Sequence, residues 1–368
     1  MSTVPVLTHG VMEAGGSYNL HAKVPAGGGD LALPYLGKAA QSCTLPPEDF
    51  PVVIADYGSS QGKNSLAPMR AAIRCLRMRV GSERAVIVSH VDQHANDFNT
   101  LFEVLHNHPE RYTLNDPHVF PFAIGRSFYE SVFPREQVNL GWCSYAAVWL
   151  SRIPALIPGH FISHFSTGEA RAAFARQAAD DWKLFLSLRA AELRDGGRLV
   201  VVLPGLNDAG VTGFEPLFDC ANTVLEKLAH EHVITVDERK QMVLGAYPRR
   251  RAQLFEPFNA DGQFQSLSVE HYELFDLPDA AWADYQLDGN AEAFVRRHAA
   301  FFRAIFVPSL ASAISDSSRR QAFAENLEQE LKQCLSGVRT PLHSFVQVMV
   351  LAKRGPAVTP SPRSNTQK

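Results

Sequence analysis

The sequence has few cysteines, and they show no pattern of metal ligands or of disulfide pairs. Its 368 residues include five cysteines, and none of them forms a Cys-x-x-Cys pair. An odd and unpatterned set is typical of free thiols in a reducing compartment, and it argues against a disulfide framework or a zinc site. We therefore expect a cytoplasmic protein that binds no metal.

An excess of basic residues and a long apolar run are also missing. The formal net charge is -3, whereas nucleic-acid-binding domains are normally basic. No apolar run approaches the roughly 20 residues that a transmembrane helix requires. Residues Met1 to Gly16 lack a charged segment followed by an apolar core, so we expect no signal peptide. Neither a nucleic-acid partner nor a membrane is predicted.

The dinucleotide fingerprint Gly-x-Gly-x-x-Gly is absent from the segment that otherwise looks most like a nucleotide-binding corner. An apolar, β-branched run ends there in Asp56, a turn with Gly58 and Gly62 follows, and an amphipathic helix begins. A strand that stops at such a turn exposes free backbone N–H groups and a helix N-terminus. The arrangement predicts a cofactor that contains adenosine rather than NAD specifically. A turn without a ligand and a dehydrogenase remain alternatives.

Short apolar runs alternate with amphipathic helical patterns, which predicts a mostly parallel, three-layer α/β sheet. Two later strands bring the expected number to seven, with the last one antiparallel. Strands are expected at residues 52–55, 85–89, 119–124, 138–143, 199–203, 266–273 and 344–352. Helices are expected near 66–76, 96–105, 169–193 and 290–336, with a glycine turn at 194–198.

These patterns divide the chain into four parts. Residues 1–205 hold the N-terminal segment and the cofactor-binding sheet, and residues 206–265 are expected to form a helical cap. Residues 266–353 add the final strands and further cap helices. Residues 354–368 are rich in Pro, Ser and Thr, which predicts a disordered tail.

Four motifs follow one another at residues 56–64, 96–102, 127–134 and 144–151. They contain Asp-Tyr-Gly-Ser-Ser-Gln-Gly-Lys-Asn, Asn-Asp-Phe-Asn-Thr-Leu-Phe, Ser-Phe-Tyr with a later Phe-Pro, and Ser-Tyr-Ala-Ala-Val-Trp-Leu-Ser. Together they resemble the SABATH methyltransferases, which use S-adenosylmethionine to methylate small acids such as salicylate, jasmonate and indole-acetate, or ring nitrogens of xanthines. The resemblance extends from Ser17-Tyr18 to residues 346–353. It implies a Rossmann-like methyltransferase sheet with a helical cap.

The resemblance also implies which residues bind the cofactor. Asp92 would accept hydrogen bonds from the ribose hydroxyls, because a carboxylate offers two acceptor oxygens to a diol. Without the resemblance, Asp92 could be a helix N-cap and Phe128 a packing residue. The residues assigned to S-adenosylmethionine, or to its product S-adenosylhomocysteine, are Tyr18, Asp56, Gly58, Ser59, Asn64, Asp92, Gln93, Ser127, Phe128 and Cys143.

The resemblance places Tyr145, Val148 and Trp149 in the acceptor pocket, with the Trp149 indole N–H donating to a substrate carboxylate. No residue is assigned as a base, because a carboxylic acid is already ionised at neutral pH. Pro25 stands where the family usually carries a carboxylate-gripping Gln, so Lys23, or alternatively His21, is the candidate for that role. Without the resemblance, Tyr145 and Trp149 would be core aromatics on a helical turn.

The expected function is an S-adenosylmethionine-dependent O-methyltransferase that converts a small carboxylic acid to its methyl ester. An N-methyltransferase for a small heteroaromatic substrate and a non-catalytic adenosylmethionine-binding protein are the alternatives. The small Val148 and the basic run Arg249 to Arg251 leave room for aromatic or dicarboxylic acceptors. A homodimer is what the resemblance suggests.

Overall fold

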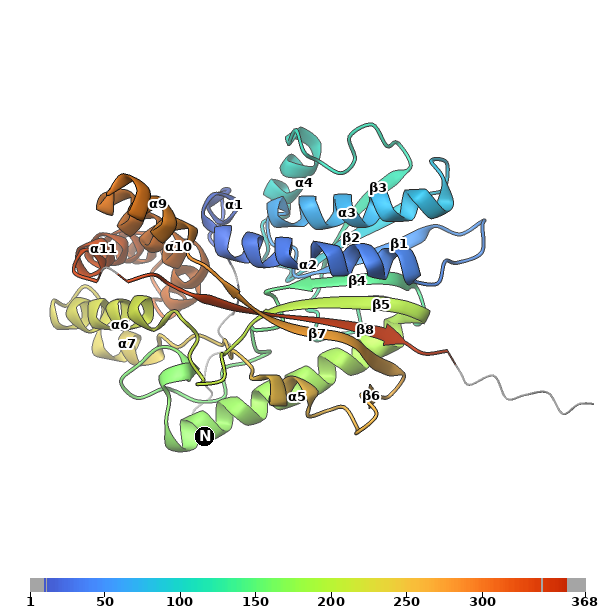
Figure 1. Cartoon of the computed structure of the whole chain (residues 1–368). Coiled ribbons are helices and arrows are strands. Elements are labelled where there is room, and N and C mark those ends of the chain that lie inside the picture. The colour runs from blue at the N-terminus through green and yellow to red at the C-terminus, as the bar shows by residue number, and fades with distance from the viewer. Residues whose placement is uncertain (1–9, 11, 339, 356–368) are drawn as a thin grey trace, which may run out of the picture.

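One mixed β-sheet runs through the whole protein and organises the helices around it (Figure 1). The computed structural model describes residues 10, 12–338 and 340–355. The strands are β1 (Val52–Tyr57), β2 (Val86–Asp92), β3 (Val119–Gly125), β4 (Val138–Ser144), β5 (Leu193–Pro204), β6 (Gln263–Phe264), β7 (Leu267–Leu277) and β8 (Ser344–Lys353). The helices are α1 (Ser17–His21), α2 (Lys23–Ser42), α3 (Lys63–Val80), α4 (Phe98–Asn107), α5 (Gly168–Glu192), α6 (Glu215–His230), α7 (Val236–Gln241), α8 (Arg251–Phe255), α9 (Ala280–Asp288), α10 (Ala291–Ala311) and α11 (Ser317–Ser336), with a 3-10 turn at Ser163–Phe165.

The strand order is β3-β2-β1-β4-β5-β8-β7-β6. Strands β1 to β5 pair in parallel, whereas β8 lies antiparallel between β5 and β7. The expected α/β class and the antiparallel last strand are therefore confirmed. The sheet has eight strands instead of the expected seven, because the two-residue β6 pairs with β7 at the edge.

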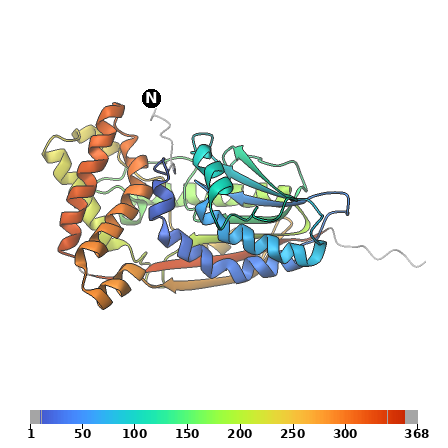
Figure 2. The ribbon, with the colours of Figure 1, turned by 90° about the horizontal axis from the view of Figure 1, so that it is seen from above.

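Helices cover both faces of the sheet, and the alternation of side chains along each strand explains why. On β1, Val52 and Ile54 pack toward α2 and α3, while Ala55 and Tyr57 pack toward α5. A strand buried on both faces reads as a continuous apolar run, which is the pattern seen in the sequence. Figure 2 shows α2 and α3 lying along one face of the sheet.

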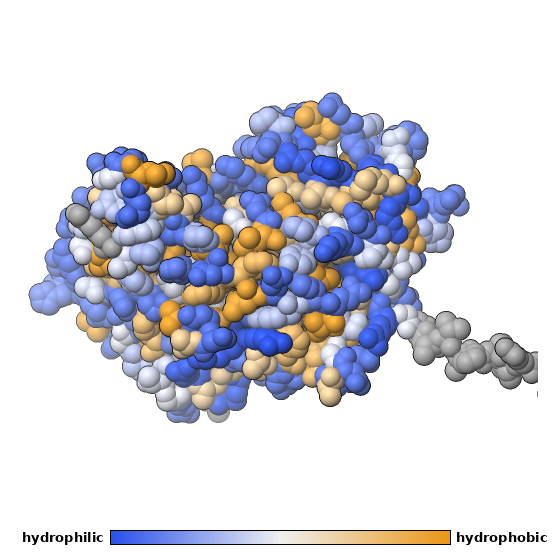
Figure 3. Space-filling view, viewed as in Figure 1, coloured by the Kyte–Doolittle hydropathy of each residue, from blue (hydrophilic) through white to orange (hydrophobic). Residues whose placement is uncertain are grey.

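A second hydrophobic core lies beyond the carboxyl ends of the parallel strands. It is built mainly from α6, α10 and α11, which stand together at one end of the molecule in Figures 1 and 2. The side chains of Asn290 and Asp316 cap α10 and α11 by accepting backbone N–H bonds. In Figure 3, hydrophobic side chains show between these helices and the sheet on an otherwise largely hydrophilic face. None of the described helices is long and apolar enough to cross a membrane.

Two local expectations were wrong. The glycine turn expected at residues 194–198 is part of β5, which begins at Leu193 directly after α5 and passes through Gly196 at φ 74°. Tyr145 and Trp149 do not lie on a helical turn, because the chain leaves β4 through a turn in which Tyr145 has φ 58°. Residues 356–368 of the expected disordered tail lie outside the described residues.

Candidate functional site

A cavity lies between the carboxyl ends of the parallel strands and the cap helices. Its walls come from the turns after β1, β2, β4 and β5, from α1 and α2, and from α6 and α10. It encloses about 1140 Å³, its open mouth included. Ligands of open α/β sheets bind at this edge.

The turn after β1 is tied to the end of β2. The backbone N–H of Ser60 donates to Asp92 Oδ2 at 2.7 Å, and the N–H of Gln93 donates to Asp92 Oδ1 at 2.8 Å. The Asn96 side-chain amide donates to the Ser60 carbonyl at 2.8 Å. Gly58 and Ser60 both have positive φ, at 88° and 48°. The glycine turn and Asp92 therefore form one rigid unit at the cavity wall.

Burial raises the pKa of Asp92 to about 6, since the two backbone N–H bonds only partly offset the loss of water and Asp56 adds a nearby negative charge. Each Asp92 oxygen still has an accepting lone pair that the backbone does not use. The carboxylate is therefore suited to a neutral diol, which supplies two further donors.

Other features of this wall fit an adenosylmethionine-type ligand. Ser60 Oγ, in the wall, is buried and has no hydrogen-bond partner among the described residues; the same is true of Ser59 Oγ and Gln61 Oε1, which belong to the same turn but do not line the cavity. A buried polar group without a hydrogen-bond partner destabilises the protein unless a ligand or a water molecule supplies that partner. A Cβ added at Gly58 would overlap Ala146, so only glycine allows the turn to lie this close to the chain after β4. The wall thus combines an unpaired polar atom with a close backbone approach.

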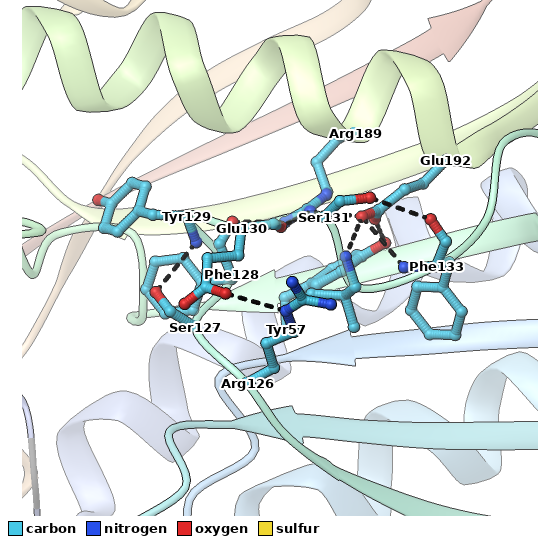
Figure 4. Close-up of polar contacts among 11 residues, drawn as sticks. Tyr57, Arg126, Ser127, Phe128, Tyr129, Glu130, Ser131, Phe133, Arg189 and Glu192 are labelled. Carbon is cyan, nitrogen blue, oxygen red and sulfur yellow. Dashed lines mark hydrogen bonds and ion pairs between the residues drawn. The ribbon is translucent and has the colours of Figure 1, made fainter.

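A buried ion pair holds the segment at residues 127–133, which carries Phe128 into the cavity wall. Arg189 and Glu192, near the end of α5, are fully buried and lie 2.9 Å apart. Arg189 donates to the Phe128 carbonyl at 2.8 Å, and Glu192 accepts the Val132 N–H at 2.7 Å (Figure 4). A buried ion pair is favourable only when further hydrogen bonds offset the loss of water; here both terminal nitrogens of Arg189 donate and Glu192 accepts from Tyr57 as well, although Arg189 Nε has no partner among the described residues. The pair therefore fixes the position of Phe128.

The other half of the cavity is apolar and lies under the cap. It is lined by aromatic and aliphatic side chains of α6 and α10, namely Phe214 just before α6, Phe218, Phe301, Ile305 and Phe306. Trp149 stands at the border of this half, with its ring centroid 6.3 Å from that of Phe306. The Trp149 indole N–H makes no hydrogen bond to any described residue. Within the part of the chain that the structure describes, this donor is thus without an acceptor in an apolar compartment.

Comparison with known proteins identifies the chain. Residues 8–354 match the family described as SAM dependent carboxyl methyltransferase. The chain belongs to this family. S-adenosylmethionine, the cofactor expected from the sequence, is thereby confirmed as the cofactor of the family.

Several relatives in this family are similar over part or most of the chain. Loganic acid O-methyltransferase of Catharanthus roseus is 29% identical over 54% of this chain and 55% of its own length. Salicylate/benzoate carboxyl methyltransferase of Arabidopsis thaliana is 27% identical over 62% of this chain and 64% of its own length. The chain thus spans less than two thirds of either relative. A 7-methylxanthine methyltransferase of Camellia ptilophylla is 24% identical over 83% of this chain and 89% of its own length.

The fold is also that of a solved structure. Loganic acid methyltransferase with SAH aligns with a TM-score of 0.76 and 22% identity, over 95% of this chain and 100% of that chain. This similarity confirms the methyltransferase fold expected from the sequence.

The structure brings eight of the residues assigned by the family resemblance to the cavity. They come from α1, from the ends of β1, β2 and β4, and from the segment after β3. They are Tyr18, Gly58, Asp92, Gln93, Phe128, Tyr145, Val148 and Trp149.

Five residues assigned to the cofactor are absent from the lining of the cavity. Asp56 is 2% exposed, and its Oδ2 accepts from Ser65 at 2.5 Å and contacts His90 Nδ1 at 2.8 Å. Burial raises the pKa of the Cys143 thiol to about 12, so it is neutral and unreactive. The other three are also absent from the cavity wall, and they are Ser59, Asn64 and Ser127.

The basic residues considered for substrate binding lie elsewhere. Lys23 is exposed, and neither it nor His21 lines the cavity. Arg249 is buried and donates to the backbone carbonyls of Ala147 and Ala178 at 2.6 and 2.8 Å, so its guanidinium group stabilises the fold. Among the described residues, no cluster of three His, Cys, Asp or Glu could hold a metal ion.

Several cavity residues were missed by sequence reasoning. Ser60 lies inside the first of the four ordered motifs, so closer attention to the turn could have found it. Thr212 and Ser344, and the phenylalanines of the cap, come from segments that carry no motif. Their only signal in the sequence is helical or strand periodicity, which does not tell a cavity wall from a core.

Proposed function

We propose that this protein transfers a methyl group from S-adenosylmethionine to a carboxylate oxygen of a small organic acid and releases the methyl ester. The observation that carries the proposal is the division of one cavity into two halves. The first half presents Asp92 and the glycine turn, and the second is apolar, with the Trp149 N–H, which has no acceptor among the described residues, at its border. Membership of the carboxyl methyltransferase family supports the same reaction.

The residues of the cavity suit a reaction that needs positioning more than proton transfer. Bound S-adenosylmethionine supplies an electrophilic methyl group on a positively charged sulfur. Asp92 and Phe128 would hold its nucleoside, and Trp149 would direct an acceptor oxygen to within roughly 3 Å of the methyl carbon. An ionised acid requires no base. In agreement, the described residues that line the cavity include no Lys, Arg or His, and Asp92 is their only carboxylate.

The apolar half favours acids with an apolar body and a single charge. The phenylalanines of the cap exclude water, which strengthens each remaining electrostatic interaction. A second carboxylate buried there would find no cation on the described wall, and an unpaired buried charge is very costly. Arg249 donates its hydrogen bonds to backbone carbonyls. The basic run therefore no longer supports the expectation of a dicarboxylic acceptor.

Methylation of a ring nitrogen is the second candidate, and the similarity to the 7-methylxanthine enzyme over 83% of this chain favours it. Trp149 argues against it, because an indole N–H only donates and therefore suits an anion better than a ring nitrogen that must keep its lone pair.

Incubation with radiolabelled adenosylmethionine and matched acceptors tests the proposal. The panel contains aromatic and aliphatic monoacids, their dicarboxylic analogues and xanthines. The expected product is an apolar monoester that mild base hydrolyses with loss of the label. A labelled product that resists mild base would establish N-methylation instead, and a protein that binds adenosylhomocysteine yet labels nothing would refute a catalytic role.

We infer further that the protein is a cytoplasmic homodimer. All five cysteines are free thiols, which supports a reducing compartment. Phe50, Phe120 and Phe122 are exposed around a groove at the β3 edge, and exposed apolar groups of this kind often mark an interface. Light scattering on the purified protein tests the dimer, and a monomeric mass at micromolar concentration would refute it.

A further inference from the structure

Two buried hydroxyls in the cavity have no hydrogen-bond partner among the described residues. They are the Ser344 hydroxyl, at the start of β8, and the Tyr145 hydroxyl, just after β4. Ser344 is 3% exposed, and both residues line the cavity. An unpaired buried hydroxyl costs roughly 1–3 kcal/mol. Two of them in one wall indicate that a polar group of a ligand belongs between them.

The two hydroxyls are neighbours. Burial raises the pKa of Tyr145, and the Ser344 hydroxyl lies close enough to offset part of that rise, although the two hydroxyls do not meet the geometry of a hydrogen bond with each other. The Tyr145 ring lies directly against the backbone of α2, because a Cβ on Gly28 would overlap its hydroxyl. Tyr145 also keeps a left-handed backbone, with φ 58°, and its N–H donates to the Val202 carbonyl at 2.8 Å. Such strain persists only where the surroundings hold the residue firmly.

Pro25 lies one helical turn before Gly28 on the same helix and also lines the cavity. Its ring carries no donor, and the nearby Lys23 is exposed. This part of the wall therefore has no side-chain donor on α2, while the Tyr145 hydroxyl beside Gly28 and the neighbouring Ser344 hydroxyl have no acceptor among the described residues.

We infer that Ser344, together with Tyr145, donates a hydrogen bond to the acceptor carboxylate oxygen that Trp149 does not hold. The inference rests on the proposed ester-forming function and assigns to Ser344 the place that a side chain at Pro25 cannot fill. Three neutral donors hold the acid without a salt bridge, so the attacking oxygen keeps its electron density.

The Ser344→Ala variant tests the inference, because it removes one oxygen and little else. Ser309→Ala is the matched control, since Ser309 is 4% exposed, has an unpaired Oγ and lies on α10 away from the cavity wall. Calorimetry with adenosylhomocysteine present compares each variant's affinity for the best acid and for its methyl ester. Steady-state kinetics give KM and kcat.

Ser344→Ala is expected to lower acid affinity and kcat/KM by roughly 10- to 100-fold. Its affinities for the ester and for adenosylhomocysteine should be unchanged, and Ser309→Ala should behave as wild type. Tyr145→Phe should likewise lower the affinity for the acid and leave the affinity for the ester unchanged.

Unchanged acid affinity in Ser344→Ala would overturn the inference, and so would an equal loss for acid and ester, which would indicate a change of shape alone. Both outcomes leave the proposed function standing, provided that the wild type esterifies the acid. A wild type that esterifies none of the acids would instead refute the proposed function.

Discussion

Asp92 should make cofactor binding depend on pH in a range where an exposed aspartate does not titrate. Burial raises its pKa to about 6. Only the ionised carboxylate offers all of its lone pairs to ribose hydroxyls while still accepting the Ser60 and Gln93 N–H groups. Adenosylhomocysteine should therefore bind the ionised form and lose affinity as the pH falls through about 6.

The magnitude follows from the fraction ionised. With a pKa of about 6, roughly one tenth of the carboxylates are charged at about pH 5, so the Kd should be about tenfold higher there than at about pH 8. The free energy of unfolding of the ligand-free protein should change in the opposite direction and fall as the pH rises. Because the folded pKa lies above its ordinary value, ionisation costs the ligand-free protein up to about 3 kcal/mol, and this cost develops as the pH rises from about 4 to about 6.

The assay is calorimetric titration of adenosylhomocysteine across this pH range, with Asp92→Asn as the matched variant. The Asn side chain keeps one acceptor oxygen, so the variant should bind more weakly at neutral pH and show a flat profile. Removing the buried charge should also raise its ligand-free Tm, by less than the full cost, because one backbone N–H loses its acceptor. A flat wild-type profile, or a variant that keeps the pH dependence, would refute the reasoning.

Three further predictions concern other sites. Trp149→Phe should keep adenosylhomocysteine affinity and lower kcat/KM by roughly 10- to 100-fold, since one hydrogen bond to a charge is lost; an unchanged rate would make Trp149 a packing residue. Burial raises the pKa of Glu215, but hydrogen bonds from His164 and the Thr212 N–H lower it to about 2. Ionised Glu215 therefore stabilises the folded protein above about pH 4.5, and this stabilisation is lost as the pH falls toward 2. Glu215→Gln should therefore lower the unfolding free energy at neutral pH by roughly 1–2 kcal/mol, allowing for its partial exposure, and the two proteins should converge in acid. The thiols of Cys220 and Cys334 lie 2.7 Å apart between α6 and α11, so hydrogen peroxide should join them with loss of two hydrogens; peptide mass mapping that finds both thiols free would contradict this.

The sequence by itself located part of the wall that we propose for the cofactor. A buried strand that ends in an acid and a glycine turn is a local pattern, and parallel strands bring their carboxyl ends to one edge. The pattern alone therefore assigns Gly58 and Asp92 to one wall. The ordered motifs added Phe128 to this wall and assigned Tyr145 and Trp149 to the acceptor pocket, because a family resemblance carries three-dimensional information that periodicity lacks.

Only the tertiary structure placed Ser344 and the phenylalanines of the cap in the half of the cavity that we propose for the acceptor. Ser344 reads in the sequence only as the start of a strand, and it reaches Tyr145 across about 200 residues of chain because β8 returns antiparallel beside β5. The structure also showed which residue of α2 faces the cavity. Pro25 lines it, whereas Lys23 faces solvent on another side of the helix.

Burial determined the structural role of the Arg189–Glu192 ion pair. Arg189 and Glu192 stand three residues apart on a helix, a spacing that usually marks a weak surface ion pair. Packing against the sheet makes them a fully buried support for Phe128. Periodicity determines which residues are turned inward, but only the assembled core determines what they meet there.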